Sequence, residues 1–193
     1  MSSLPSLSLA EWVVLAVISE RPTHGFAIAQ LTAGDGELGQ VWQIPRPIVY
    51  RAIGRVAAAG LIAADGIEPG HGPQRTIYAV TSAGGDALDA WLQTPVKHIR
   101  EVRSHLLMKL ALLHRTGADP TKLLRRQQAA LAPIASAMTT SNDEPDGFGA
   151  TLLAWRRANA QAAISFLADI TPGGEPSAGA HHAGRRRSVA ARP

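Results

Sequence analysis

Three arginines lie close together between residues 46 and 55, and no acidic residue occurs between Glu37 and Asp65. They are Arg46, Arg51 and Arg55. A guanidinium group keeps its charge and donates paired hydrogen bonds, so it binds phosphate groups or the edge of a guanine base. The cluster therefore predicts a surface that contacts a polyanion. The alternative is an ordinary solvated helix face, and which arginine would meet a base and which a phosphate is left open by the sequence.

The segment that carries these arginines has the signals of a short helix. Pro47 suits the first helical position, where a missing N–H costs nothing, and Gly60 suits the left-handed residue that ends a helix. Tyr50 could pack its ring in the domain, donate its hydroxyl group to a phosphate, or do both. Between the two ends, apolar residues recur at helical spacing at Val49, Ile53, Val56 and Ala57. One side of the helix can therefore pack while Arg46, Pro47, Tyr50, Arg51 and Arg55 meet DNA.

Two further helices are expected before the arginine-bearing helix. A helix over 9–19 follows a cap at Ser8. A second short helix over 26–32 opens at His24-Gly25. The arginine-bearing helix is therefore the third along the chain.

A β-hairpin is expected after the third helix. Two β-prone runs, 61–68 and 76–81, flank a glycine-rich tip at 69–75. This is the winged helix-turn-helix order, in which the third helix enters the major groove of DNA and the hairpin is the wing. At the tip, His71 and Arg75 are candidates for contact with the minor groove or the phosphate backbone. The alternative for both is a mobile exposed turn.

The second half of the chain reads as helical. Thr81 can cap a helix to about Leu92, and Thr94-Pro95 marks a hinge. Beyond it lie three amphipathic segments, at 102–114, 120–138 and 148–169, and Asp119 can cap the second of them. Three helices with wide apolar faces are too few to enclose a core alone, so we expect them to pack on a second copy of the chain.

The expected fold class is therefore mainly α with a small β-hairpin: a winged helix-turn-helix plus a helical C-terminal dimerisation domain. We expect a DNA-binding domain over 1–94, a helical dimerisation domain with an effector site over 95–171, and a disordered basic tail over 172–193. The side chains considered for the effector site are Met108, Trp155 and Phe166. The alternative is that these three belong to the core or the dimer seam.

Composition narrows the class of protein without deciding it. The chain has 193 residues, 46% of them hydrophobic, which is enough for a core. Its net charge is +4, but residues 1–94 carry −3 and the segment from Glu175 onward carries +3, so total charge does not argue for nucleic acid. The absence of cysteine fits a reducing cytoplasm. No leader pattern or membrane-spanning run is seen, so we expect a cytoplasmic protein.

No pattern of catalytic or metal-binding residues is visible. His98, His105 and His114 lack the spacing of a helical zinc site. No Gly-x-Ser-x-Gly elbow occurs, and the glycines at 34, 36 and 39 follow a helix and not a strand, unlike a dinucleotide loop. We therefore expect no enzyme activity, no cofactor and no metal.

Several motifs together resemble the PadR family of bacterial transcriptional regulators, in particular its longer members with a multi-helix C-terminal domain. The resemblance spans about residues 7–169. The motifs are His24-Gly25-Phe26, Val49-Tyr50-Arg51-Ala52-Ile53, Gly60-Leu61-Ile62, the run from Gln74 to Thr81 with Gly84, Trp91-Leu92 with Pro95, and the run from Val102 to Lys109. Family members often carry a small hydroxyl residue at the helix cap and before the Val-Tyr pair, where this chain has Pro45 and Ile48. The operator sequence of other members is therefore not carried over.

The resemblance implies a homodimeric, sequence-specific DNA-binding regulator, usually a repressor, whose third helix and wing bind operator DNA. Its C-terminal helices would dimerise, and some members respond to phenolic or other small hydrophobic effectors. The expected partners are double-stranded DNA, a second copy of the chain and a small hydrophobic or aromatic effector. Two alternatives stay open: a winged-helix module that binds another protein, which the acidic balance of residues 1–94 favours, and a small-molecule-binding protein without a DNA role.

Overall fold

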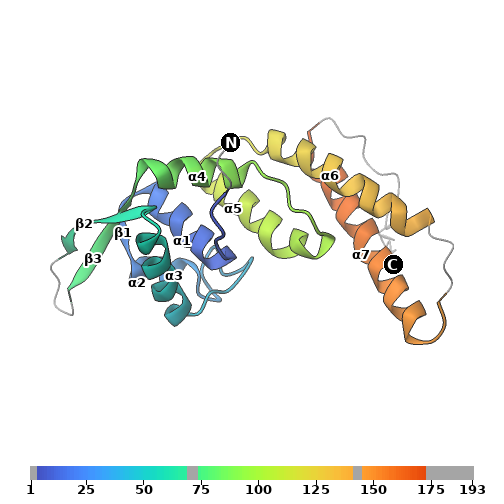
Figure 1. The fold of residues 1–193 in the computed structure, drawn as a ribbon, viewed down its shortest axis with the longest axis horizontal. Helices are drawn as coiled ribbons and strands as arrows, with labels where there is room; N and C mark the ends of the chain where they lie inside the picture. Colours follow the sequence, from blue (N-terminus) through green and yellow to red (C-terminus); the bar gives the residue numbers. More distant parts are fainter. Residues whose placement is uncertain (1–3, 69–73, 141–144, 173–193) are drawn as a thin grey trace, which may run out of the picture.

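The computed structural model describes residues 4–68, 74–140 and 145–172, and these form an elongated, mainly helical molecule (Figure 1). The N-terminal part contains α1 (Leu9–Glu20), β1 (Thr23–His24), α2 (Gly25–Leu31), α3 (Arg46–Ala58), β2 (Ile62–Glu68), β3 (Arg75–Val80) and α4 (Ser82–Leu92). The C-terminal part contains the 3-10 turn η1 (Ile99–Glu101), the π turn η2 (Val102–Leu106), α5 (Leu107–Arg115), α6 (Thr121–Thr140) and α7 (Phe148–Ile170). The predicted fold class, a winged helix-turn-helix followed by helices, is confirmed.

Helix α1 is the centre of the N-terminal part. Its predicted cap is confirmed as a capping box: the Glu11 N–H donates to Ser8 Oγ at 3.4 Å, and the Ser8 N–H donates to Glu11 Oε2 at 2.8 Å. Every residue from Glu11 to Ile18 is buried. This burial on several sides arises because α3, α4, α5 and β3 all contact the helix.

The small sheet joins the helix-turn-helix to the wing. Its three antiparallel strands run in the order β1-β3-β2, with Tyr78 of β3 paired to Thr23 on one side and to Ala64 on the other. Strand β1 was not predicted, because two residues are too few to show alternation. Since β1 directly precedes α2, this pairing fixes the start of α2 against the wing. His71 at the tip of the predicted hairpin lies outside the described residues.

Other predicted helix boundaries are also found. Gly60 has φ +70°, so it ends α3 in the left-handed region. Thr81 Oγ1 accepts the Gly84 N–H at 3.1 Å and caps α4. Asp119 accepts the Thr121 N–H at 2.9 Å, and hydrogen bonds from Thr121 hold the pKa of the Asp119 carboxyl below its usual value. The π turn η2, by contrast, replaces the first residues of a helix that was predicted to begin at Val102, and the 3-10 turn η1 precedes it.

The buried side chains form two cores, and α5 contributes to both. The first core includes Val13, Leu15, Ile28, Val49, Val56, Leu88, Trp91, Met108 and Leu112. The second includes Val96, Leu106, Leu113, Leu123, Leu124, Leu131, Ala163 and Leu167. Figure 1 shows the consequence: α6 and α7 lie side by side away from the sheet, and α5 stands between them and α1.

A buried lysine stands at the joint between these two parts. Lys109 is 3% exposed, and its Nζ donates a hydrogen bond to the Thr94 carbonyl oxygen. The ammonium group also lies over the Trp91 ring, 4.6 Å from its centroid, and Trp91 stacks on Trp12 with 5.0 Å between ring centroids. Burial lowers the pKa of Lys109 to about 8, although the charge of Glu101 acts in the opposite direction.

Two polar contacts complete the joint. Gln127 of α6 is fully buried and bonds both backbone groups of Val96: Oε1 accepts the Val96 N–H at 2.7 Å, and Nε2 donates to the Val96 carbonyl at 3.0 Å. Arg115 at the end of α5 donates two hydrogen bonds to Glu20 of α1, at 2.8 and 2.7 Å, and a further one to Glu37. The segment after the Thr94-Pro95 hinge is therefore held by Gln127 of α6, while Arg115 ties α5 to α1. The predicted tail lies, apart from its first residue, outside the described residues.

Candidate nucleic-acid interface

Helix α3 divides into a buried face and an exposed face. Val49, Ala52, Ile53 and Val56 are buried, and at 100° per residue they fall on one side of the helix. Arg46, Pro47, Tyr50, Arg51 and Arg55 are all exposed and occupy the remaining circumference of the helix, with Arg46 next to the buried face. Pro45, at the helix cap, makes no side-chain hydrogen bond to the first turn, and its carbonyl oxygen accepts the Ile48 N–H at 2.8 Å and the Val49 N–H at 3.2 Å.

One edge of this exposed face is supported by aromatic rings. The Arg46 guanidinium carbon lies 5.6 Å from the centroid of the Tyr50 ring and 5.4 Å from that of Phe26 on α2. Tyr50 is 46% exposed. Such cation–π contacts orient a guanidinium group without neutralising its charge. Arg46 therefore keeps its full charge at the start of α3.

The wing reaches the same place. The Arg75 guanidinium carbon lies 4.8 Å from the centroid of the Phe26 ring. A cleft of about 420 Å³ opens there between α2, α3 and β3. Its lining residues are His24, Gly25, Phe26, Arg46, Tyr50, Ile53, Gly54, Gln74, Arg75, Thr76 and Tyr78, none of which is acidic. Arg46, Tyr50 and Arg75, which were predicted from separate segments, are thus brought together.

The other edge of the exposed face carries Arg51 and Arg55, one helical turn apart. Arg55 Nε lies 3.4 Å from Glu11 Oε1, which is the carboxylate of the α1 capping box, and 66% of the Arg55 side chain remains exposed. Arg51 is exposed and takes part in no ion pair within the described chain. The charge of Arg55 is therefore partly engaged by Glu11, in a contact that links α3 to α1. The charge of Arg51 is more available for an external anion.

Sequence reasoning missed two residues of this surface. His24 caps α2, with Nδ1 accepting the Ala27 N–H at 3.1 Å, and its Nε2 lies 3.0 Å from Glu68 Oε2 of the wing strand β2. Phe26 supports Arg46 and Arg75. Both residues belong to the His24-Gly25-Phe26 motif, which was interpreted as a helix start and as part of the family resemblance, without a role at the surface. The contact partners lie far along the chain, so no local pattern indicated these roles.

The side chains considered for an effector site lie in three different places among the described residues. Met108 is fully buried in the first core, and Phe166 packs on the second. Trp155 is 67% exposed and borders a separate cleft of about 420 Å³ with Met138 and Arg103. Within the described chain, no group of three or more His, Asp or Glu side chains is arranged to hold a metal ion.

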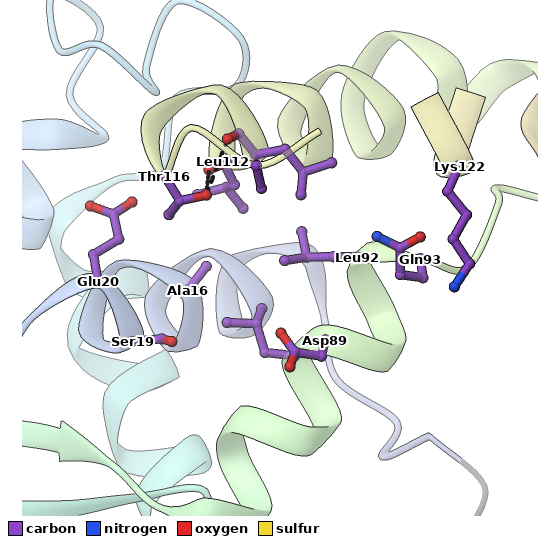
Figure 2. Close-up of a pocket in the computed structure, with 12 residues that line it drawn as sticks. Ala16, Ser19, Glu20, Asp89, Leu92, Gln93, Leu112, Thr116 and Lys122 are labelled. Atoms are coloured by element: carbon purple, nitrogen blue, oxygen red, sulfur yellow. Dashed lines mark hydrogen bonds between the residues drawn. The ribbon is translucent and has the colours of Figure 1, made fainter. Parts of the chain in front are cut away.

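Another cavity, of about 500 Å³, lies between α1, α4 and α5 (Figure 2). Leu92 extends into it from α4, and Leu112 faces it from α5. Gln93 and Lys122 also line it, and Gln93 Oε1 is a buried oxygen without a hydrogen-bond partner among the described residues. The cavity thus combines apolar side chains with polar ones, and three of the polar residues, Glu20, Asp89 and Lys122, are charged.

These elements define a winged helix-turn-helix protein that exposes a basic third helix beside its wing. A family model described as the transcriptional regulator PadR-like family matches residues 14–90. Over these residues, which are less than half of the chain, the sequence is similar to the PadR-like family of transcriptional regulators. None of its helices in the described ranges is long and apolar enough to cross a membrane.

Solved structures that match the chain include Bacillus subtilis PadR in complex with operator DNA, with 19% identity, a TM-score of 0.44, and coverage of 84% of this chain and 97% of that one. The structure of Bacillus subtilis PadR has 17% identity, a TM-score of 0.39, and coverage of 88% and 96%. Smu.1604c from Streptococcus mutans UA159 has 17% identity, a TM-score of 0.40, and coverage of 82% and 96%. No curated protein matches the chain.

Proposed function

We propose that the protein is a repressor that binds operator DNA as a homodimer through α3 and the wing. The observation that carries this proposal is the exposed face of α3, where Arg46 and Arg51 are available to phosphates and base edges. Residues 1–94 as a whole carry a net charge of −3, so this basic face opposes the charge of its own domain. A dimer would present two such helices to successive major grooves. Occupancy of the operator alone would then block transcription.

The DNA-binding part is tested by titrating labelled DNA from upstream of the protein's own coding region. If each subunit neutralises about three to five phosphates, the logarithm of affinity falls with the logarithm of salt at a slope of about −5 to −9. Arg51→Ala should weaken affinity by about tenfold or more, because each dimer loses two cations. The matched control is Arg125→Ala on the exposed face of α6. Equal affinity for unrelated DNA, or no difference between the two variants, contradicts the proposal.

The dimer is supported by the apolar surface of α7. Phe148 is 78% exposed and Trp155 is 67% exposed, although both are large hydrophobic side chains. Helices α6 and α7 contact each other as a pair, so the second core has protein on only part of its surface. Sedimentation should show a dimer for the wild type and a monomer for Trp155→Glu, with Ala83→Glu on α4 as the control. A monomeric wild type at micromolar concentration contradicts this part.

Release by an effector is proposed for the cavity between α1, α4 and α5. A small, mainly hydrophobic ligand there would contact both the first core and the joint. It would shift the equilibrium between the DNA-bound and the released arrangement of the protein only if it bound one of the two better. A panel of neutral aromatic compounds should contain one that lowers DNA affinity. Leu92→Trp fills the cavity and should abolish that response, whereas Ala90→Trp, which is exposed on the same helix, should keep it. Equal affinity of the compound for free and DNA-bound protein contradicts release.

A further inference from the structure

Phe26 lies beneath two cations that come from different elements. Its ring is 5.4 Å from the guanidinium carbon of Arg46 on α3 and 4.8 Å from that of Arg75 on the wing. The negative face of an aromatic ring attracts a cation and fixes its direction. One side chain of α2 therefore orients a guanidinium group on the third helix and another on the wing.

The surroundings favour an anion between these cations. No carboxylate lines the cleft that contains them. Glu68 on the neighbouring strand is paired with His24. Two like charges that share one ring repel each other, and a bound anion relieves that repulsion. The cleft volume of about 420 Å³ leaves ample room for one phosphate group.

The residues before Phe26 hold it in place. His24 caps α2, and β1 pairs this segment with β3 of the wing. Gly25 lets the Tyr50 ring approach the backbone: a Cβ atom at this position would lie 2.8 Å from Tyr50 Cε1 and 2.9 Å from the Ile53 side chain. In this motif His24 therefore caps α2, Gly25 leaves room for the Tyr50 ring, and Phe26 contacts the two arginines.

We propose that Phe26 is a positioning residue that joins Arg46 and Arg75 into a single site for one backbone phosphate of duplex DNA. The site links the recognition helix to the wing, so both would bind the duplex in a fixed relation. This inference rests on the proposed DNA-binding function.

The test is a mutant cycle measured by fluorescence anisotropy with the upstream DNA and the full chain. Phe26→Leu removes the aromatic face but keeps an apolar side chain, and it should weaken DNA affinity by about fivefold. In the Arg46→Ala/Arg75→Ala background the same change should alter affinity by less than about twofold, because nothing is left to position. Phe26→Tyr restores the ring and should bind within about twofold of the wild type.

The outcomes separate the inference from the proposed function. An equal loss from Phe26→Leu in both backgrounds would show a purely structural role and overturn the inference, as would a weak Phe26→Tyr variant. If Arg51→Ala lowers affinity while Arg46→Ala and Arg75→Ala do not, DNA binding stands and the joint phosphate site is wrong. If none of the three arginine variants changes affinity, both proposals are wrong. Thermal unfolding of each DNA-free variant checks that the fold is retained.

Discussion

The two cores of this protein are built in different ways. In the first, α1 is surrounded by α3, α4, α5 and β3, and eight consecutive residues from Glu11 to Ile18 are buried. In the second, the α6–α7 pair covers one side only, and Phe148 and Trp155 remain exposed. Burial of apolar surface is the main stabilising contribution to folding, so the first core is complete within one chain whereas the second gains from a further surface. The contacts of Lys109, Gln127 and Arg115 at the joint determine how strongly the stability of one core depends on the other.

The largest effect is expected from a cavity in the first core. Leu15 is fully buried, and Leu15→Ala removes the Cγ atom and both Cδ methyl groups from packed surroundings. The free energy of unfolding should fall by about 3–5 kcal/mol, measured by urea denaturation. Leu153→Ala on α7, where the side chain is only partly buried, is the control and should cost less. A similar loss in both variants would contradict the difference between the cores.

The buried lysine at the joint should make stability depend on pH. The pKa of Lys109 is lowered from 10.5 to about 8, so in this range the unfolded chain binds more protons than the folded one. Stability from this group is therefore flat below about pH 8 and rises by up to about 3 kcal/mol as pH approaches 10.5. Lys109→Met should remove the rise, seen as the difference between wild-type and variant unfolding curves. Parallel curves for the two proteins would show that Lys109 is not the group responsible.

A smaller effect is expected from the amide that ties α6 to the hinge segment. Gln127→Ala leaves the N–H and carbonyl groups of Val96 without their partner while Val96 stays buried. Unpaired buried backbone groups should lower the free energy of unfolding by about 2–3 kcal/mol. Gln128→Ala, whose partly buried amide bonds only the Leu167 carbonyl, is the neighbouring control. Hydrogen exchange of the Val96 amide should also become faster in the Gln127 variant alone.

The smallest effect is expected from the ion pair that links α5 to α1. Arg115 and Glu20 are 15% and 18% exposed, and Arg115 binds the carboxylate through two nitrogens. Arg115→Lys keeps the charge but loses the paired geometry, and it should cost about 1 kcal/mol, reduced further by salt. Thermal unfolding at low and high salt measures it. A loss as large as that of the core variant would mean that this pair, and not apolar packing, holds α5 on the first core.

Much of the fold could be predicted from local signals. Ser8, Thr81 and Asp119 were predicted as caps because their side chains act within three residues, and Gly60 because its conformation is required by the helix end. Local patterns do not indicate which distant residue a side chain will contact. The burial of α1 on all sides, the short strand β1 and the contribution of α5 to both cores depend on contacts between distant segments.

The same limit applies to the candidate site. The charge of Arg46, Arg51 and Arg55 and their exposed helix face followed from spacing. The difference among them did not: Arg55 is engaged by Glu11, while Arg46 is supported by rings from two elements. Phe26 carries no polar group, so its sequence position alone gave no reason to include it in a DNA-binding surface.

The place of α5 in both cores determines where the chain can be shortened. A fragment that stops at the Thr94-Pro95 hinge would lack Met108 and Leu112, and α1 would then present bare apolar surface to water. The smallest autonomous winged-helix fragment should therefore extend to Thr116, past the end of α5, and not to the hinge. A fragment that ends at the hinge is therefore expected to aggregate. Grafting this winged-helix unit onto another protein would require α5 to be included.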